Sequence, residues 1–175
     1  LSRDMVREFC DGLQSTYGPT GEDLGWGKDS VTAMVKHWTG EGASEGGREA
    51  HLDGGKYAVY PNGNFEALMI PFVDGAFKLT GKTGSAAAVM SSYTAAWSDD
   101  GSLGEAVGSG FSEYKIKKLL RNRYGFSGPV CTDWMVLNEG IKEGKRHCGW
   151  GAHIEDPEVE AGERAFLAIM AGVDQ

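Results

Sequence analysis

The sequence predicts an α/β protein, and more specifically part of a TIM-type (β/α)8 barrel in which parallel strands alternate with helices. Three observations support this fold class. Apolar runs typical of short buried strands alternate with amphipathic helical patterns along the chain. The segments after the strands are long and glycine-rich, whereas those before them are short. Charged and aromatic residues stand at the strand ends, where the functional groups of such a barrel lie.

The first half of the chain predicts two helices and two strands. Met5, Phe9 and Leu13 recur at helical spacing, and Asn64 is a suitable N-cap for a second helix that Pro71 should kink. The expected elements are a helix over 2–15, a loop over 16–28, a strand over 31–36, a glycine-rich loop over 39–63 with a short hairpin at 56–60, a helix over 64–77 and a strand over 85–92.

The second half continues the alternation. Ser112 should cap one helix, and Pro157-Glu158 should open another. The expected elements are a loop over 94–110, a helix from Ser112, a strand over 129–132, a helix reaching Met170 and a turn over 171–174 that enters a further strand. Three or four β/α units cannot close an eight-stranded barrel, so residues 1–175 are expected to form one partial barrel domain.

Composition excludes several classes of partner. The net charge of −8 argues against binding to nucleic acid or anionic membranes. No apolar stretch approaches the roughly 18 residues that a membrane span needs. Three cysteines without CxxC spacing, and four histidines without HxH or HExxH spacing, indicate neither a disulfide framework nor a metal site. Phosphate-loop and dinucleotide fingerprints are also absent, and no cofactor is expected.

Asp133 is the principal candidate for chemistry. It belongs to the run Cys131-Thr132-Asp133-Trp134, which follows a predicted buried strand. A carboxylate is costly to bury unless it is paired or hydrogen-bonded, which suggests a reactive group facing a carbohydrate-sized pocket. An ionised Asp held near an anomeric carbon can act as a nucleophile. The structural alternatives are an Asp that caps the following helix and an ordinary half-buried Trp134.

Lys36 and His37 place two hydrogen-bond donors side by side near another strand end. Paired donors suit the paired hydroxyls of a sugar. The alternative is a solvated lysine beside a histidine whose hydrogen bonds are satisfied within the protein. Arg48 lies in the loop that follows, and a single loop arginine is usually a surface residue.

Five sequence blocks, in order and at matching spacing, resemble glycoside hydrolase family 3, in the branch that contains bacterial β-glucosidases. The blocks are Ala33–Trp38, Glu45–Arg48, Val89–Tyr93, Phe126–Trp134 and Ala171–Asp174. The resemblance is to the N-terminal barrel domain and runs over essentially the whole chain. Two departures are visible: the usual Lys-His-Phe/Tyr is Lys-His-Trp here, and the loop from Gly40 to Tyr60 is longer than in common members.

The resemblance implies a retaining hydrolase that releases β-linked glucose from the non-reducing end of β-glucosides or short β-glucans. It makes Asp133 the nucleophile. The substrate-binding residues it implies are Lys36, His37, Arg48, Tyr93 and Trp134. Because Trp38, Tyr93, Trp97 and Trp134 exceed the aromatic needs of a one-sugar pocket, at least one is expected to stack on a second sugar.

The resemblance also implies groups that this sequence does not contain. The start of the barrel and the α/β sandwich domain that supplies the acid/base carboxylate are absent, so the chain alone is expected to be inactive. A homodimer is a further assembly to consider, and the family resemblance favours a periplasmic or secreted location. The alternative function is that of a non-catalytic carbohydrate-binding or structural relative without the acid/base.

Overall fold

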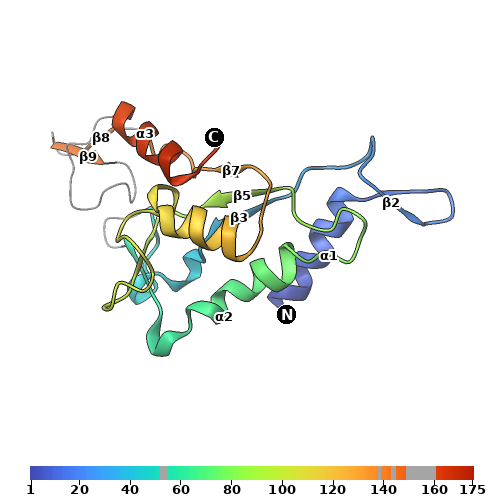
Figure 1. Ribbon diagram of the computed structural model, residues 1–175, viewed down its shortest axis with the longest axis horizontal. Coiled ribbons are helices and arrows are strands. Elements are labelled where there is room, and N and C mark those ends of the chain that lie inside the picture. The colour runs from blue at the N-terminus through green and yellow to red at the C-terminus, as the bar shows by residue number, and fades with distance from the viewer. Residues whose placement is uncertain (52–54, 138, 143–144, 149–160) are drawn as a thin grey trace.

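Three short parallel strands form the centre of the fold in the computed structural model (Figure 1). They are β3 (Met34–Trp38), β5 (Ala88–Ser91) and β7 (Val130–Cys131), adjacent in that order. Val89 lies opposite both Val35 and Val130, in two parallel ladders. The structure describes residues 1–51, 55–137, 139–142, 145–148 and 161–175, with side chains described outside 138–160.

Helical segments precede, connect and follow these strands. They are α1 (Ser2–Gln14), α2 (Phe65–Ile70) with its continuation η4 (Pro71–Ala76), η6 (Tyr114–Arg123) and α3 (Ala161–Ala171). The α2–η4 segment lies between β3 and β5 in the chain, and η6 lies between β5 and β7. Strands that neighbour one another in both sequence and space, with helical crossovers, are the repeating unit of a (β/α) barrel. The predicted fold class is therefore confirmed, and the sheet of the described residues is open.

Pro71 alters the second helix without ending it. The backbone is α-helical up to Ile70 and has the wider π-helical pitch from Pro71 to Ala76. The amide of Phe77 accordingly donates a 2.8 Å hydrogen bond to the carbonyl of Phe72, five residues earlier. Proline has no N–H to offer a regular helical ladder, so the pitch changes at this residue. Asn64 occupies the N-cap position, but its side chain makes no capping hydrogen bond.

The long segments after the strands are more ordered than the sequence predicted. The hairpin expected at 56–60 is wrong, because β4 (Tyr57–Val59) pairs in parallel with β6 (Ala95–Trp97) of the next loop. The loop expected over 94–110 therefore contains a strand. Four short 3₁₀ turns complete these segments: η1 (Glu41–Ala43), η2 (Glu45–Gly47), η3 (Pro61–Gly63) and η5 (Ser109–Phe111).

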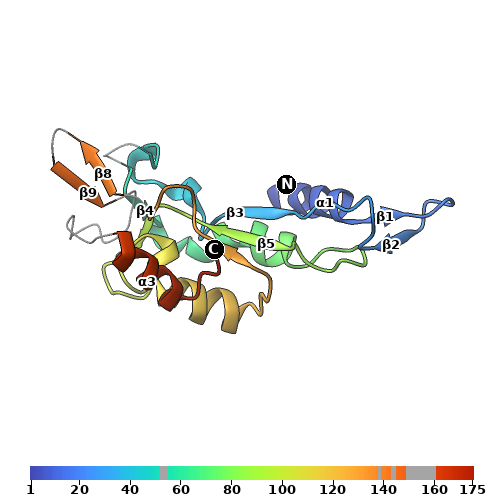
Figure 2. The same ribbon diagram turned by 90° about the horizontal axis from the view of Figure 1, so that it is seen from above.

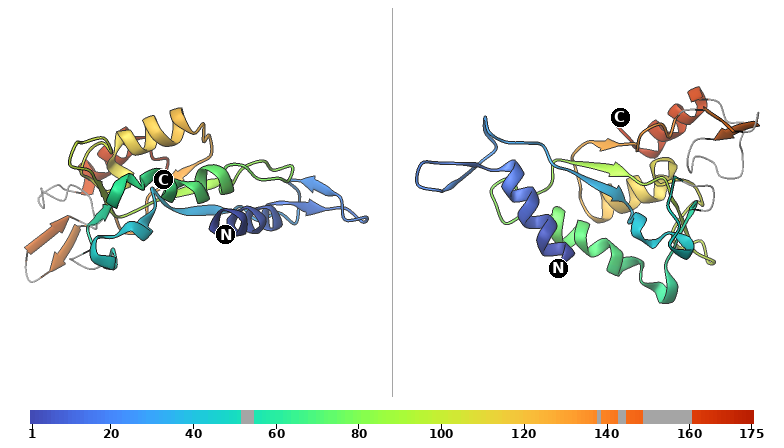
Figure 3. Two further views of the ribbon diagram at one scale, coloured as in Figure 1. Left: turned by 90° about the horizontal axis from the view of Figure 1, so that it is seen from below. Right: turned by 180° about the vertical axis from the view of Figure 1, so that it is seen from behind.

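Two antiparallel hairpins lie at opposite ends of the molecule (Figures 2 and 3). One pairs β1 (Thr16–Tyr17) with β2 (Asp23–Gly25), inside the segment 16–28 that was expected to be a loop. The other pairs β8 (Glu139–Lys142) with β9 (Lys145–Cys148). The central sheet lies between the hairpins.

Trp38, at the end of β3, is at the centre of the core. Its side chain is fully buried, and its ring packs edge-on against Phe72, with ring centroids 5.3 Å apart, and against Tyr124 at 6.0 Å. Its indole Nε1 donates a 3.0 Å hydrogen bond to the carbonyl of Lys115. This buried donor has a partner, as burial of a Trp requires. Trp38 thus joins β3 to both of the helical segments that flank the sheet.

The chain returns to the sheet after α3. The amide of Asp174 donates a 2.8 Å hydrogen bond to the carbonyl of Val130, and the amide of Thr132 donates to the carbonyl of Gln175 at 2.7 Å. These bonds place the segment after Gly172 beside β7, as expected for the approach to a further strand. The helix start predicted at Pro157-Glu158 lies outside the described residues. Within the described part of the chain, no helix is long and apolar enough to cross a membrane.

Candidate functional site

Lys36 and His37 lie within a strand rather than after its end. The sequence predicted a strand over 31–36, whereas β3 spans Met34–Trp38. The strand continues because Trp38 is buried in the core and pairs with Ser91 of β5. The peptide bonds Lys36–His37 and Trp38–Thr39 are both cis. The Lys36 side chain is exposed, and that of His37 is about one quarter exposed.

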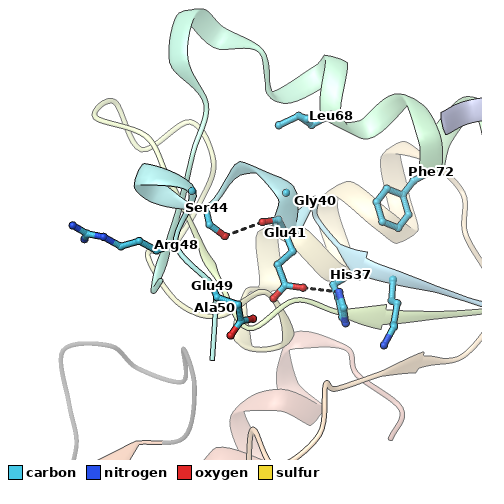
Figure 4. Close-up of a pocket in the computed structure, with 12 residues that line it drawn as sticks. His37, Gly40, Glu41, Ser44, Arg48, Glu49, Ala50, Leu68 and Phe72 are labelled. Carbon is cyan, nitrogen blue, oxygen red and sulfur yellow. Dashed lines mark hydrogen bonds and ion pairs between the residues drawn. The ribbon is translucent and has the colours of Figure 1, made fainter. Parts of the chain in front are cut away.

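His37 lies between two carboxylates. Its Nε2 is 3.2 Å from Oδ2 of Asp133, and its Nδ1 is 2.5 Å from Oε2 of Glu41. The contact with Glu41 is visible in Figure 4. Asp133 is the second residue after β7 and is buried, with a relative exposure of 8%. Its other oxygen, Oδ1, accepts a 2.6 Å hydrogen bond from the amide of Trp134. The buried carboxylate is therefore satisfied on both sides.

Tyr93 borders the same carboxylate. It is buried, and its hydroxyl donates a 2.7 Å hydrogen bond to the carbonyl oxygen of Trp134. Burial raises the pKa of Tyr93 far above its usual range, and the negative charges of Asp133, Glu41 and Glu49 raise it further. Three carboxylates thus act on one hydroxyl, and the field in this part of the site is negative.

The negative charge of Asp133 also affects the thiol of Cys131. Burial raises its pKa, and the charge of Asp133 raises it further. Cys131 and the buried Cys10 are both free thiols. A thiol that keeps its proton is a poor nucleophile.

A cavity of about 560 Å³ opens on the Glu41 side of His37 (Figure 4). Its polar lining includes Lys36, His37, Glu41, Ser44, Arg48 and Glu49, and its apolar lining includes Leu68 and Phe72. Asp133 does not line this cavity; it contacts the opposite nitrogen of the imidazole. The side chain of Arg48 extends away from His37 in Figure 4 and is exposed.

The aromatic side chains differ in their access to a ligand. Trp134 is 76% exposed and Trp97 is 44% exposed, so both rings can be approached from solvent. The ring of Trp97 packs edge-on against Tyr57, with centroids 5.5 Å apart. Trp38 cannot be a stacking surface, because its ring is enclosed in the core. The sequence pattern did not distinguish this buried tryptophan from the exposed ones.

The structure brings together most of the predicted site residues. Asp133 contacts His37 and Trp134, Tyr93 contacts Trp134, and Lys36 shares the cavity with His37. Arg48 lines the cavity without pointing towards this group. The sequence analysis missed Glu41. The sequence did contain one indication of its position. Glu41 is four residues after His37 and follows a glycine, so a turn at Gly40 can bring the two side chains together. No group of three His, Cys, Asp or Glu side chains suited to a metal occurs in the described part of the chain.

Fold and site together define a (β/α)-barrel protein whose carboxylate, imidazole and aromatic groups gather at the carboxyl ends of its strands. The family model "Glycosyl hydrolase family 3 N terminal domain" matches residues 1–175. The chain belongs to this family.

Curated relatives match the whole chain. A periplasmic beta-glucosidase/beta-xylosidase of Dickeya chrysanthemi is 34% identical over 186 residues, which cover 100% of this chain and 26% of that protein. A beta-glucosidase C of Emericella nidulans is 31% identical over 178 residues, covering 100% of this chain and 25% of the relative. A probable beta-glucosidase C of Aspergillus flavus is 30% identical over 175 residues, with 100% and 25% covered. The chain spans about a quarter of the length of these relatives.

Proposed function

We propose that this chain is the nucleophile-bearing part of a retaining β-glycosidase that releases β-linked glucose from the non-reducing end of β-glucosides and short β-glucans. The observation that carries the proposal is Asp133. It is a buried carboxylate at the end of a central strand, held by the amide of Trp134 and by His37. Support comes from the family and from the relatives, which are named as β-glucosidases or a β-glucosidase/β-xylosidase.

In this mechanism Asp133 attacks the anomeric carbon and the leaving oxygen departs with a proton from a second carboxylic acid. The covalent glycosyl-enzyme is then hydrolysed by a water molecule that the same second group deprotonates. We assign that second group to a sandwich domain elsewhere in the polypeptide. General acid–base help is worth about 10²–10⁴-fold, so residues 1–175 alone should turn over very slowly.

The remaining assignments concern binding. The exposed Lys36 donates hydrogen bonds to hydroxyls of the sugar. His37 lies between Asp133 and Glu41, so it donates to a hydroxyl only where the sugar replaces one of these carboxylates as its acceptor. Tyr93 restrains the backbone next to the nucleophile, and the exposed ring of Trp134 packs on a sugar face. Arg48 joins the substrate only if its side chain turns inward from the orientation in Figure 4. We further propose that the full-length protein is periplasmic or secreted, which the name of the periplasmic Dickeya relative supports.

The test is covalent trapping of the nucleophile in the full-length protein. A 2-fluoro-glucoside with a dinitrophenyl leaving group should leave its sugar on Asp133, as read by peptide mass mapping. Asp133→Gly should abolish turnover, and added azide should restore release of the leaving group with formation of an α-glucosyl azide. Asp29→Asn, a change at an exposed aspartate, is the matched control. A label on another residue would refute the assignment. Tight binding of glucosides with neither label nor turnover would favour a non-catalytic carbohydrate-binding protein.

A further inference from the structure

Glu41 is a carboxylate at the site to which neither the sequence nor the family has given a role. Gly40 brings it there: this residue has a φ of 95°, and its amide donates a 2.8 Å hydrogen bond to the carbonyl of His37. The resulting turn reverses the chain after β3 and returns Glu41 to the ring of His37. The side chains of Glu41 and His37 are 20% and 23% exposed, respectively, so their 2.5 Å contact is largely shielded from water.

The two contacts of His37 limit its protonation. A neutral imidazole has one N–H donor and one acceptor, whereas an imidazolium donates from both nitrogens. Ionised carboxylates can only accept. Nδ1 faces Oε2 of Glu41 while Nε2 faces Oδ2 of Asp133. With both carboxylates ionised, both contacts are hydrogen bonds only when His37 carries two protons. A neutral His37 protonated at Nδ1 would direct a lone pair at Asp133.

Several charged and titratable groups surround His37. Besides Asp133 and Glu41, they include Lys36 on its own strand, Tyr93 after β5, Cys131 on β7, and Arg48 and Glu49 on the loop after β3. Glu49 is 2.5 Å from Nδ1 of His51. Oε1 of Glu41 is buried and has no hydrogen-bond partner among the described residues. The charge of Glu41 is therefore directed mainly at His37.

We propose that Glu41 is a positioning residue that keeps His37 doubly protonated and turned towards Asp133, so that the free site is a carboxylate–imidazolium–carboxylate relay. This rests on the proposed function of Asp133 as the nucleophile. The imidazolium holds Oδ2 of Asp133 in place while the aspartate stays ionised for attack. Glu41 acts through His37 and does not touch the reacting atoms.

The kinetic test compares Glu41→Gln with the parent in the full-length enzyme. Glutamine keeps the shape and can still accept from Nδ1, but it removes the charge. Loss of the charge should lower kcat several-fold and leave KM little changed, because Glu41 acts through His37 and not on the substrate. Glu45→Gln is the matched control, because Glu45 lies on the same loop, is exposed and does not line the cavity. It should leave kcat and KM unchanged.

A second readout does not need turnover. Nitrogen NMR of the full-length protein with ¹⁵N-labelled histidine should show both ring nitrogens of His37 protonated at neutral pH, with His37→Asn identifying the signal. Glu41→Gln should convert His37 to a singly protonated ring. A neutral His37 in the parent, or an unchanged spectrum in Glu41→Gln, overturns the relay even if the enzyme is a glucosidase. A doubly protonated His37 in a protein that cleaves no glucoside supports the relay and refutes the proposed function.

Discussion

The hydroxyl of Tyr93 donates a 2.7 Å hydrogen bond to the backbone carbonyl of Trp134. This bond connects the segment after β5 to the turn after β7. Asp133 is the residue before Trp134, so Tyr93 restrains the Trp134–Met135 peptide that follows it. The indole of Trp134 is 76% exposed, which leaves the ring accessible while its backbone is held.

Tyr93→Phe should therefore weaken the site more than the fold. Loss of one hydrogen bond should lower the free energy of unfolding by about 1 kcal/mol. We expect kcat to fall several-fold while KM changes little, because the substitution loosens the backbone beside the proposed nucleophile and leaves the cavity lining intact. Tyr57→Phe is the control, since Tyr57 lies on β4 and packs against Trp97. Equal kcat values for Tyr93→Phe and Tyr57→Phe would contradict this role.

Met135 adopts a left-handed backbone conformation, with a φ of 62°, in the turn after Asp133. This conformation costs a residue with a side chain about 1–2 kcal/mol, and asparagine tolerates it best after glycine. Met135→Asn should raise the free energy of unfolding by about 1 kcal/mol, measured by thermal or denaturant unfolding. The comparison is Met170→Asn at an exposed position of α3, which should be neutral or slightly destabilising. A lower stability for Met135→Asn than for Met170→Asn would show that the turn is not strained.

Lys115 is fully buried at the start of η6, and its Nζ donates to the carbonyls of Glu105 at 3.2 Å and Val107 at 3.3 Å. Burial lowers the pKa of Lys115 from 10.5 to about 8, and the opposite charge of Glu105 limits the shift. Burial would raise the pKa of Glu105, but a hydrogen bond from Ser112 and backbone amides outweigh it and leave that pKa lowered. Lys115 and Glu105 thus hold the segment before η5 against η6.

The pH dependence follows from the depressed lysine pKa. Below pH 8 the lysine is protonated in both the folded and the unfolded protein. Between about pH 8 and 10.5 the unfolded chain keeps a proton that the folded protein has released, so this group makes the free energy of unfolding rise with pH. The parent should gain about 2–3 kcal/mol relative to Lys115→Met across this window. Lys118→Met, at an exposed position of the same helix, should run parallel to the parent. A flat difference between the parent and Lys115→Met would show that Lys115 is not titrating in this range.

Features set by local sequence could be predicted, whereas features set by contacts between distant segments could not. The helices, the central strands and the position of Asp133 follow from local periodicity and from the polar residues that end apolar runs, and these were predicted. The parallel pairing of β4 with β6 depends on two loops far apart in the sequence meeting in space, which periodicity does not encode. Glu41 reaches His37 because Gly40 adopts a positive φ, a consequence of the folded backbone. Trp38 and Trp134 look alike in sequence, yet one fills the core and the other is exposed.

Gln14 is another residue whose role only tertiary structure shows. It lies at the end of α1, where a polar residue is unremarkable in sequence, and it is fully buried. Its Oε1 accepts hydrogen bonds from the amides of Ala87 at 2.9 Å and Ala33 at 3.3 Å. Its Nε2 donates to the carbonyl of Ser85 at 2.9 Å and to Oγ1 of Thr83 at 3.2 Å. One side chain thus joins α1 to the segments that lead into β3 and β5.

Gln14→Leu should be among the most destabilising single changes in the chain. Leucine fills a similar volume but leaves buried amide and carbonyl groups without partners, at a cost of about 1–3 kcal/mol for each group that water cannot reach. We expect a loss of about 3 kcal/mol or more in the free energy of unfolding, measured by denaturant titration of the full-length protein. Thr83→Val, which removes one of the four hydrogen bonds, should cost about 1 kcal/mol. If Gln14→Leu and Thr83→Val lower the free energy of unfolding by the same small amount, Gln14 does not hold α1 against the segments that lead into β3 and β5.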